Sequence, residues 1–317
     1  MVALPCGRGS DPLPIVLGPT GSGKSELAIQ IALALGGEIV NCDSLQIYRR
    51  FDIGTAKVPE SARRGVPHHL IDVIDPGQLF TAGDYAREAR AALRDIAARR
   101  RIPIVVGGTG FYLRALLDGL SHGPARNPEL RLRLERREQK RPLSLYRILS
   151  RLDPAAASRI HANDTKKLIR VLEVRLLEGR PITEFFARGR DPLTGFSPIK
   201  LGLNPPRALL NQRLDARTTC IFEAGLIEEV RTLLSSGVSR DAKPFESLGY
   251  KQALQVVEGR LTLEQALEST QLETRRYAKR QVTWFRKEPD VQWLDDFGDN
   301  PDVQARALAM VEKKCAS

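Results

Sequence analysis

The residues best suited to chemistry lie near the N-terminus, in a glycine-rich loop that matches the pattern GxxxxGK(S/T). The loop reads Gly18-Pro19-Thr20-Gly21-Ser22-Gly23-Lys24-Ser25. Its glycines let the backbone wrap a phosphate group so that several N–H groups point inward. The side chain of Lys24 adds a positive charge, and the hydroxyl of Ser25 can hold Mg²⁺. The loop therefore predicts a site for a di- or triphosphate, with Mg²⁺ as cofactor.

An acidic residue accompanies this loop, but not where ATPases and GTPases usually carry it. They place an aspartate at the end of an apolar strand, whereas here the apolar strand Ile102–Val106 ends in Gly107-Gly108-Thr109. Instead, Asp43 follows another short strand. Because the carboxyl ends of parallel strands frame the ligand crevice, Asp43 and Thr109 should both face the bound phosphates. A helix cap or an outer ligand of Mg²⁺ is the alternative role for Asp43.

The elements around these residues alternate between strand and helix. A short strand is expected at Pro14–Leu17, a helix at Glu26–Leu35 and a second strand at Glu38–Cys42. An amphipathic helix is expected at Ala82–Arg101, with its apolar residues on one face. This alternation predicts an α/β fold of the P-loop NTPase-like kind, a parallel sheet flanked by helices.

The pattern changes at about Leu120 and changes back near residue 197. Between these points we expect helices and no strand, including a helix at Asp164–Glu178 that Asn163 or Asp164 caps and Gly179 ends. We therefore predict a mostly helical insertion domain at 123–196 within a core domain formed by 14–122 and 197–317, after a disordered lead-in at 1–13. The later elements expected are a strand at Ile199–Leu203, helices at Pro206–Leu234, Glu246–Glu258 and Thr262–Lys287, and a strand at Val291–Leu294.

The overall charge favours a polyanionic partner. The 317 residues include 49 basic and 38 acidic side chains, a net charge of +11, and such an excess suits nucleic acid through phosphate neutralisation and counterion release. No apolar run is long enough to span a bilayer, and Met1–Pro14 lacks the apolar segment of a secretory signal, so a cytoplasmic protein is expected. Neither the cysteines nor the histidines have metal-ligand spacing, and His68 and His69 are expected to pack.

Seven motifs, spread along nearly the whole chain, resemble those of the tRNA dimethylallyltransferases, also called tRNA isopentenyltransferases. They are GPTGSGKS at 18–25, DSLQIYRRFDIGTAK at 43–57, HHLIDVIDP at 68–76, VVGGTGFYLRALLDGL at 105–120, HANDTKKLIRVLEV at 161–174, LGYKQ at 248–252 and AKRQVTWFRK at 278–287. The segment from Arg217 to Phe222 and the insertion depart most from the family pattern.

The resemblance implies transfer of a dimethylallyl group from dimethylallyl pyrophosphate to the exocyclic N6 amine of the adenine 3′-adjacent to the anticodon in tRNA. Asp43 matches the family's general base, which takes the N6 proton. Backbone amides of residues 21–25, Lys24, Thr109, Arg217 and Mg²⁺ held by Ser25 would stabilise the departing pyrophosphate. The chain is expected to act as a monomer.

The resemblance also implies where tRNA binds, since chemistry on a base requires that the base leave its stack. Residues Ser44, Leu45 and Gln46 would read the target adenine next to Asp43. The other predicted contacts with the anticodon stem-loop are Arg131, Lys166, Lys167 and Arg170 in the insertion, Tyr250, Lys251 and Gln252, and Lys279 and Arg280 on the C-terminal basic helix. Packing is the alternative role for Tyr250, and a solvated helix face is the alternative for each basic residue.

Three other functions are alternatives to tRNA prenylation. An adenylate isopentenyltransferase would act on free adenine nucleotides, but the basic insertion and the basic C-terminal helix count against it. A small-molecule P-loop kinase is disfavoured by the missing aspartate after Ile102–Val106. A non-catalytic RNA-binding switch that responds to nucleotides has no sequence feature in its favour.

Overall fold

The computed structural model describes residues 10–120, 123–187 and 189–315. It divides into two compact units, a core unit (Met1–Leu117 and Leu193–Ser317) and an insertion unit (Asp118–Pro192). The chain leaves and re-enters the core unit at one point, where the amide of Leu193 donates to the carbonyl of Leu117 at 2.8 Å. The predicted boundaries at 122/123 and 196/197 lie a few residues further along the chain, because the connecting residues carry no apolar pattern.

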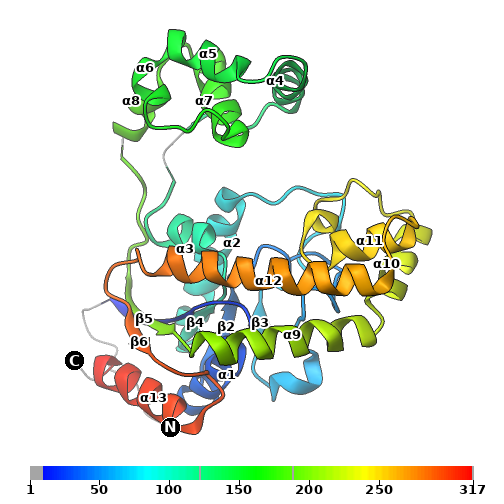
Figure 1. Cartoon of the computed structure of the whole chain (residues 1–317). Coiled ribbons are helices and arrows are strands. Elements are labelled where there is room, and N and C mark those ends of the chain that lie inside the picture. Colours follow the sequence, from blue (N-terminus) through cyan, green and yellow to red (C-terminus); the bar gives the residue numbers. More distant parts are fainter. Residues whose placement is uncertain (1–9, 121–122, 188, 316–317) are drawn as a thin grey trace. The chain divides into compact units, whose positions relative to one another are not determined.

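A six-stranded parallel sheet forms the centre of the core unit, in the order β3-β2-β4-β1-β5-β6 (Figure 1). Its strands are β1 (Asp11–Leu17), β2 (Glu38–Asn41), β3 (His68–His69), β4 (Pro103–Val106), β5 (Phe196–Leu203) and β6 (Gln292–Leu294). After β1 the chain continues to β2, which lies on one side of β1 in the sheet. After β4 it continues to β5, which lies on the other side of β1. The two glycine-rich loops after β1 and β4 therefore lie at the switch point where such sheets bind ligands. The predicted P-loop NTPase-like α/β fold is confirmed.

Strand β1 corrects one boundary. The predicted lead-in of residues 1–13 reached into it, since the strand begins at Asp11, and residues 1–9 lie outside the described residues. The amide of Asp11 bonds to Gly195 on the β5 side, so by alternation the nitrogens of Pro12 and Pro14 face β4. There β4 pairs only with the later residues Ile15 and Val16, so neither proline removes a hydrogen bond from the sheet.

Two layers of helices cover the core unit's sheet. Helix α1 (Lys24–Leu35) contacts α13 (Pro301–Cys315), and both share one apolar cluster with the strands. The sequence prediction did not include α13. The other helices of this unit are η1 (Glu60–Arg63), α2 (Ala82–Ala98), α3 (Gly110–Leu117), α9 (Arg207–Glu223), α10 (Leu226–Ser235), η2 (Lys243–Glu246), α11 (Tyr250–Val257) and α12 (Leu263–Phe285).

Two of the helices predicted near the C-terminal end of the chain are divided by glycines. The helix expected at Pro206–Leu234 is two helices, α9 and α10, because Gly225 between them has φ 99°. Likewise α11 begins only at Tyr250, after Gly249 with φ 85°, rather than at Glu246. Both glycines occupy the left-handed region, where a helix of L-residues does not continue.

The regular elements of the insertion unit are all helices within its described residues. Its helices are α4 (Pro128–Lys140), α5 (Ser144–Leu152), α6 (Pro154–Ala157), α7 (Thr165–Glu178) and α8 (Ile182–Ala187). They enclose an apolar cluster of their own that includes Leu145, Leu149, Leu168 and Leu172. Of the two predicted caps of α7, Asp164 is the one used, through the amide of Lys167. Across the described ranges of the chain, no helix combines the length and apolarity that a bilayer crossing needs.

Candidate active site

The loop after β1 depends on two glycines that no other residue could replace. Gly18 has φ 145°, and a Cβ there would lie 2.9 Å from the carbonyl oxygen of Leu203 on β5. Gly23 has φ 85°, and its Cβ would lie 2.8 Å from the nitrogen of Gly298. The amide of Gly298 donates to the carbonyl of Ser22 at 2.8 Å. The loop is therefore held closely against the core by its backbone.

The N-terminus of α1 is open toward this loop. Its N-cap is Gly23, and no side chain caps the helix. The first N–H groups of a helix have no acceptor within it, and the helix dipole makes this end attractive to anions. The hydroxyl of Ser22 is also fully buried and has no hydrogen-bond partner among the described residues. These groups form the anion cradle that the sequence pattern predicts.

Two partly buried cations and one carboxylate lie within electrostatic reach of each other at this cradle. Burial, assisted by the charge of Arg217 and opposed by that of Asp43, lowers the pKa of Lys24 to about 7. Burial also lowers the pKa of Arg217 on α9, with Arg213 adding to the effect and Asp43 opposing it. The amino group of Lys24 donates to the carbonyl of Pro19 at 2.7 Å. Positive charge thus exceeds negative charge here, and a multiply charged anion would relieve both cations.

The carboxylate of Asp43 is oriented by the chain that follows it. After β2 ends at Asn41, the Oδ1 atom of Asp43 accepts the amides of Leu45 at 2.8 Å and Gln46 at 3.4 Å. The turn uses Oδ1, and no described residue forms a hydrogen bond with Oδ2. The turn is therefore compatible with the predicted base role, which would use the other oxygen.

Thr109 lies beside Asp43, as expected for residues that follow neighbouring strands. Its hydroxyl oxygen accepts the amide of Ser44 at 3.1 Å, and its own amide donates to the carbonyl of Cys42 at 3.2 Å. A Cβ on Gly107 would collide with the backbone of Cys42, so this close approach requires glycine. Burial raises the pKa of the Cys42 thiol to about 12, which keeps it neutral. The structure thus brings Lys24, Asp43, Thr109 and Arg217 to one edge of the sheet.

Two residues of α12 belong to this site, although the sequence prediction did not place them there. Burial, followed by the charge of Asp43, raises the pKa of Tyr277 to about 12, so its phenol lies near that carboxylate. The side chain of Gln281 is buried and contacts both glycine-rich loops. A signal was present in the sequence, because Ala278, Gln281 and Phe285 form an uncharged stripe at helical spacing on a basic helix.

The motif at 248–252 has a structural role, which corrects the prediction that Tyr250 and Gln252 contact tRNA. Both side chains are buried, Tyr250 completely. The phenol of Tyr250 accepts the amide of Gly54 at 3.1 Å and donates to Glu229, whose carboxylate also accepts the amide of Ile53 at 2.9 Å. Gln252 caps the start of α11 through the amide of Gly249. The alternative of packing is therefore the right one for Tyr250, and within 250–252 only Lys251 is exposed.

The loop that Tyr250 supports also carries the residues predicted to read the adenine. The side-chain amide of Gln46 donates to the carbonyl of Thr55 at 3.2 Å, which joins the two parts of the loop. Lys57 is nearly buried and binds both Asp52 and Asp72, at 2.7 and 2.6 Å. Tyr250 and Lys57 therefore fix the segment that begins at Asp43, and they act on the site through it.

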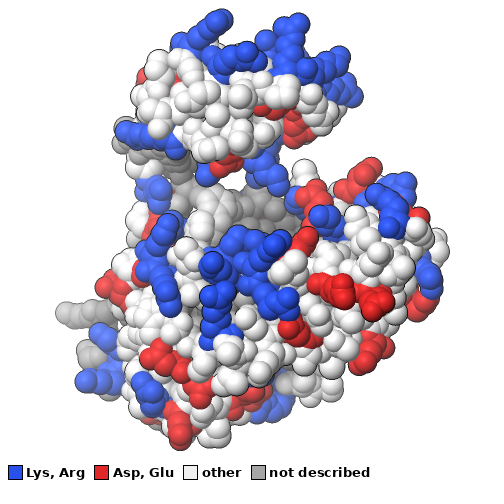
Figure 2. Space-filling model, viewed as in Figure 1, with Lys and Arg blue, Asp and Glu red and all other residues white. Residues whose placement is uncertain are grey.

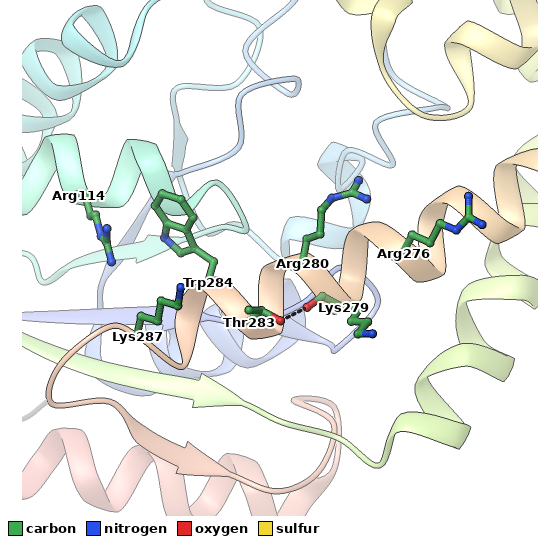
Figure 3. A pocket seen from close by; sticks show the side chains of 7 residues that line it. All are labelled: Arg114, Arg276, Lys279, Arg280, Thr283, Trp284 and Lys287. Carbon is green, nitrogen blue, oxygen red and sulfur yellow. Dashed lines mark hydrogen bonds between the residues drawn. The ribbon is translucent and has the colours of Figure 1, made fainter. Parts of the chain in front are cut away.

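A basic pocket lies on α12 and α3, with a volume of about 530 Å³ (Figure 3). Its lining contains the predicted Lys279 and Arg280, together with Arg114, Arg276, Thr283, Trp284 and Lys287. Figure 2 shows basic side chains gathered over the C-terminal half of α12. Arg114 is held in place from two sides, since its Nε donates to the buried Glu288 at 2.5 Å and its guanidinium lies 4.7 Å from the centre of the Trp284 ring. Positive charge beside an exposed aromatic ring suits single-stranded nucleic acid.

Of the four insertion residues predicted to contact tRNA, three form ion pairs within the insertion unit. Arg131 and Arg170 both bind Glu173, which is fully buried. Lys167 pairs with Asp164, and Lys166 is exposed. A second basic surface, around a cavity of about 500 Å³, lies on α4 and was not singled out as a site from the sequence; its residues are Arg133, Arg136, Arg137, Lys140 and Arg141.

The residues around Ser25 fit an Mg²⁺ ion that arrives with pyrophosphate rather than one held by the protein alone. Ser25 is exposed in the first turn of α1. Within the described ranges, no group of three histidine, cysteine or acidic side chains could enclose a metal. Mg²⁺ commonly keeps several waters and binds through one or two protein groups and substrate phosphates, which matches this arrangement.

The chain is similar over most of its length to known proteins of one family. The family model described as IPP transferase matches residues 46–288. The tRNA dimethylallyltransferase of Solibacter usitatus is 60% identical over 302 residues, which cover 95% of this chain and 98% of the relative. The solved structure of a full-length tRNA isopentenylpyrophosphate transferase from Bacillus halodurans has a TM-score of 0.70 at 34% identity and covers 96% of this chain and 98% of its own. A eukaryotic dimethylallyltransferase, described as acting on tRNA, has a TM-score of 0.84 at 30% identity, over 97% of this chain and 80% of its own.

Proposed function

The chain belongs to the IPP transferase family, and from this premise we propose that it transfers a dimethylallyl group from dimethylallyl pyrophosphate to the N6 amine of the adenine 3′-adjacent to the anticodon in tRNA. One observation carries the proposal. An anion cradle with two partly buried cations, Lys24 and Arg217, lies at the same sheet edge as a single oriented carboxylate, Asp43. The reaction needs a place for the leaving pyrophosphate and a base for the N6 proton, and this edge supplies both.

The cradle would stabilise the leaving group. As the bond between C1 of the allyl group and the pyrophosphate oxygen breaks, negative charge grows on the pyrophosphate. The open amides at the start of α1, Lys24 and Arg217 face that charge in a buried site, where such contacts count most. The hydroxyl of Thr109, whose nearest acceptor is Ser44 Oγ at 3.4 Å, can turn to a pyrophosphate oxygen. Bound Mg²⁺, held by Ser25, would supply further charge neutralisation on the leaving group.

Asp43 would act on the nucleophile. The lone pair of the N6 amine is delocalised into the adenine ring, so the amine attacks well only as it loses a proton. The bond from N6 to C1 forms, the bond from C1 to oxygen breaks, and the proton passes to Oδ2 of Asp43 while Oδ1 stays bonded to Leu45 and Gln46. Ser44, Leu45 and Gln46 follow the carboxylate directly and would surround the adenine.

The tRNA would bind through the basic surface on α12. Lys279 and Arg280 lie on the same helix as Tyr277, which is close to Asp43. An anticodon loop whose phosphates rest on this helix could therefore deliver one unstacked base to the sheet edge. The relatives that are named for their action on tRNA favour this acceptor over a free adenine nucleotide. We further propose that the protein works as a monomer in the cytoplasm, where its tRNA is found.

A single assay tests the proposal against its alternatives. The purified protein is incubated with dimethylallyl pyrophosphate and Mg²⁺, together with unmodified tRNA, AMP or ATP, and the products are analysed by mass spectrometry. We expect prenylated adenosine in the tRNA digest alone. Prenylated AMP would favour the free-nucleotide enzyme, and phosphate transfer from ATP would favour a kinase; either result without tRNA product would overturn the proposal.

A further inference from the structure

We propose that Gln281 is a positioning residue that sets the width of the pyrophosphate crevice by connecting its two walls. The inference rests on the proposed function and goes beyond it, because it assigns a role to a side chain that none of the proposed chemical steps uses.

The geometry rests on two hydrogen bonds from one buried side chain. The Oε1 atom of Gln281 accepts the amide of Thr20 in the loop after β1 at 2.8 Å. Its Nε2 atom donates to the carbonyl of Gly108 in the loop after β4 at 2.9 Å. Only 6% of the residue is exposed, so neither bond competes with bulk water. One primary amide therefore joins the two loops between which the phosphates should lie.

No other side chain of this length can make both bonds. The site needs an acceptor toward Thr20 and a donor toward Gly108, and among unbranched side chains of this length only glutamine carries both, because ionised Glu has no donor, Met has no donor, and Lys and Arg have no acceptor. A Cβ on Gly108 would collide with Nε2 of Gln281. The hydrogen bond from Gln281 therefore requires a glycine at position 108, the second glycine of the loop after β4. Because Gln281 occupies the amide of Thr20, the inward amides available for phosphate begin after Thr20.

The neighbours of Gln281 on α12 hold the helix at this position. Ala278, one turn earlier, packs with Leu214 of α9, and a Cβ on Gly21 would collide with that same leucine. Trp284, one turn later, packs directly against Gly110. Ala278 and Gln281 thus face the two loops, while Trp284 both contacts Gly110 and lines the basic pocket (Figure 3).

The experiment measures the binding of inorganic pyrophosphate with Mg²⁺ by calorimetry, alongside kcat, KM for dimethylallyl pyrophosphate and the Kd for tRNA. For Gln281→Met, which keeps length without either hydrogen bond, we expect roughly a tenfold weaker pyrophosphate Kd, the size expected for lost buried hydrogen bonds. For Gln281→Glu we expect a larger loss, because a carboxylate would face the carbonyl of Gly108. The tRNA Kd should stay within about twofold in both variants.

The matched control is Gln265→Met on the same helix. Gln265 caps the first turn of α12 through the amide of Thr262, so its loss destabilises the helix without touching either loop. We expect a lower melting temperature and an unchanged pyrophosphate Kd. If Gln281→Met behaves as this control does, losing stability but not pyrophosphate affinity, the inference is wrong. Pyrophosphate binding needs no tRNA acceptor, so the result is separable from the prenylation assay, whose failure would remove the proposed function itself.

Discussion

Two carboxylates in this protein, Glu173 and Asp43, each lie close to two cationic side chains. The two clusters differ in whether the carboxylate is hydrogen-bonded to those cations. In the insertion unit, Glu173 binds Arg131 through both oxygens and Arg170 through one, each at 2.8 Å, and also accepts the amide of Asn127. In the core unit, Asp43 is bonded to backbone amides alone, while Lys24 and Arg217 interact with it only through space.

The difference shows in the pKa values. Burial would raise the pKa of Glu173, yet the hydrogen bonds from Arg131 and Arg170 bring it down to about 2, so this cluster favours its own charges. At the sheet edge burial opposes the charge of Lys24 in the same way, but no hydrogen bond to a carboxylate of the described residues offsets it, and the pKa of Lys24 falls to about 7. In the first cluster every charge is hydrogen-bonded to an opposite charge, whereas in the second the cations have no such bond to any described residue, which is the arrangement expected of an anion site. One carboxylate and two cations can therefore form either a structural cluster or a binding site. The outcome depends on whether the carboxylate and the cations are hydrogen-bonded to each other.

Asp43→Asn should have the largest effect on catalysis. The amide can still accept the bonds from Leu45 and Gln46 but cannot take the N6 proton. We expect kcat to fall by roughly 10² to 10⁴, the usual contribution of a general base, with little change in either substrate's Kd or in the melting temperature. Single-turnover kinetics at saturating substrate would measure it. Recovery of activity at high Mg²⁺ would instead make Asp43 a metal ligand.

Glu173→Gln tests the structural cluster, and its effect should be on stability rather than chemistry. We expect a loss of about 2 kcal/mol in the unfolding of the insertion unit, less than for fully buried pairs because both arginines reach solvent. The folded pKa of about 2 lies below the ordinary value of 4.5. The stabilisation is therefore present above about pH 4.5 and lost as the pH falls toward 2. Urea unfolding across this range measures it, with the exposed Glu178→Gln on the same helix as control; equal curves for the two variants would contradict the assignment.

The two clusters also show how far the sequence could predict the site. Asp43 and Thr109 were predictable, since each follows a strand directly and parallel strands end at one edge. The role of Gln281 was not, because its partner Thr20 lies 261 residues away. For the same reason the sequence does not reveal the tertiary partners of Tyr250 and Arg131, for which the family resemblance implies contact with tRNA. These partners, Glu229 and Glu173, lie 21 and 42 residues away. Periodicity predicts elements, but hydrogen bonds between distant elements are visible only in the fold.

Lys24 should take up a proton when pyrophosphate binds beside Lys24, Arg217 and Asp43. Above pH 7 its amine is largely neutral in the free protein, because burial and Arg217 lower its pKa. Bound pyrophosphate raises that pKa again, so binding at pH 8 should take up as much as about one proton per site. Calorimetry in buffers of different ionisation enthalpy measures this number. Lys24→Met should abolish the uptake and Lys279→Met should not; uptake that persists without Lys24 would assign it to another group.

The smallest effect is expected on the outer face of α12, where each charge acts alone in water. Replacing Lys279 and Arg280 by Ala should flatten the dependence of log K for tRNA on log salt by roughly 0.7 to 0.9 per lost phosphate contact. The control replaces Arg94 on α2 and Arg306 on α13 by Ala, both exposed, so the net charge falls equally while the α12 surface stays intact. Pyrophosphate affinity should be unchanged in both double variants, because that ligand belongs to the crevice behind Gln281. If the control flattens the slope as much as the α12 variant does, tRNA responds to the overall charge of +11 rather than to this helix. A flatter slope for the α12 variant alone would show that tRNA phosphates contact Lys279 and Arg280.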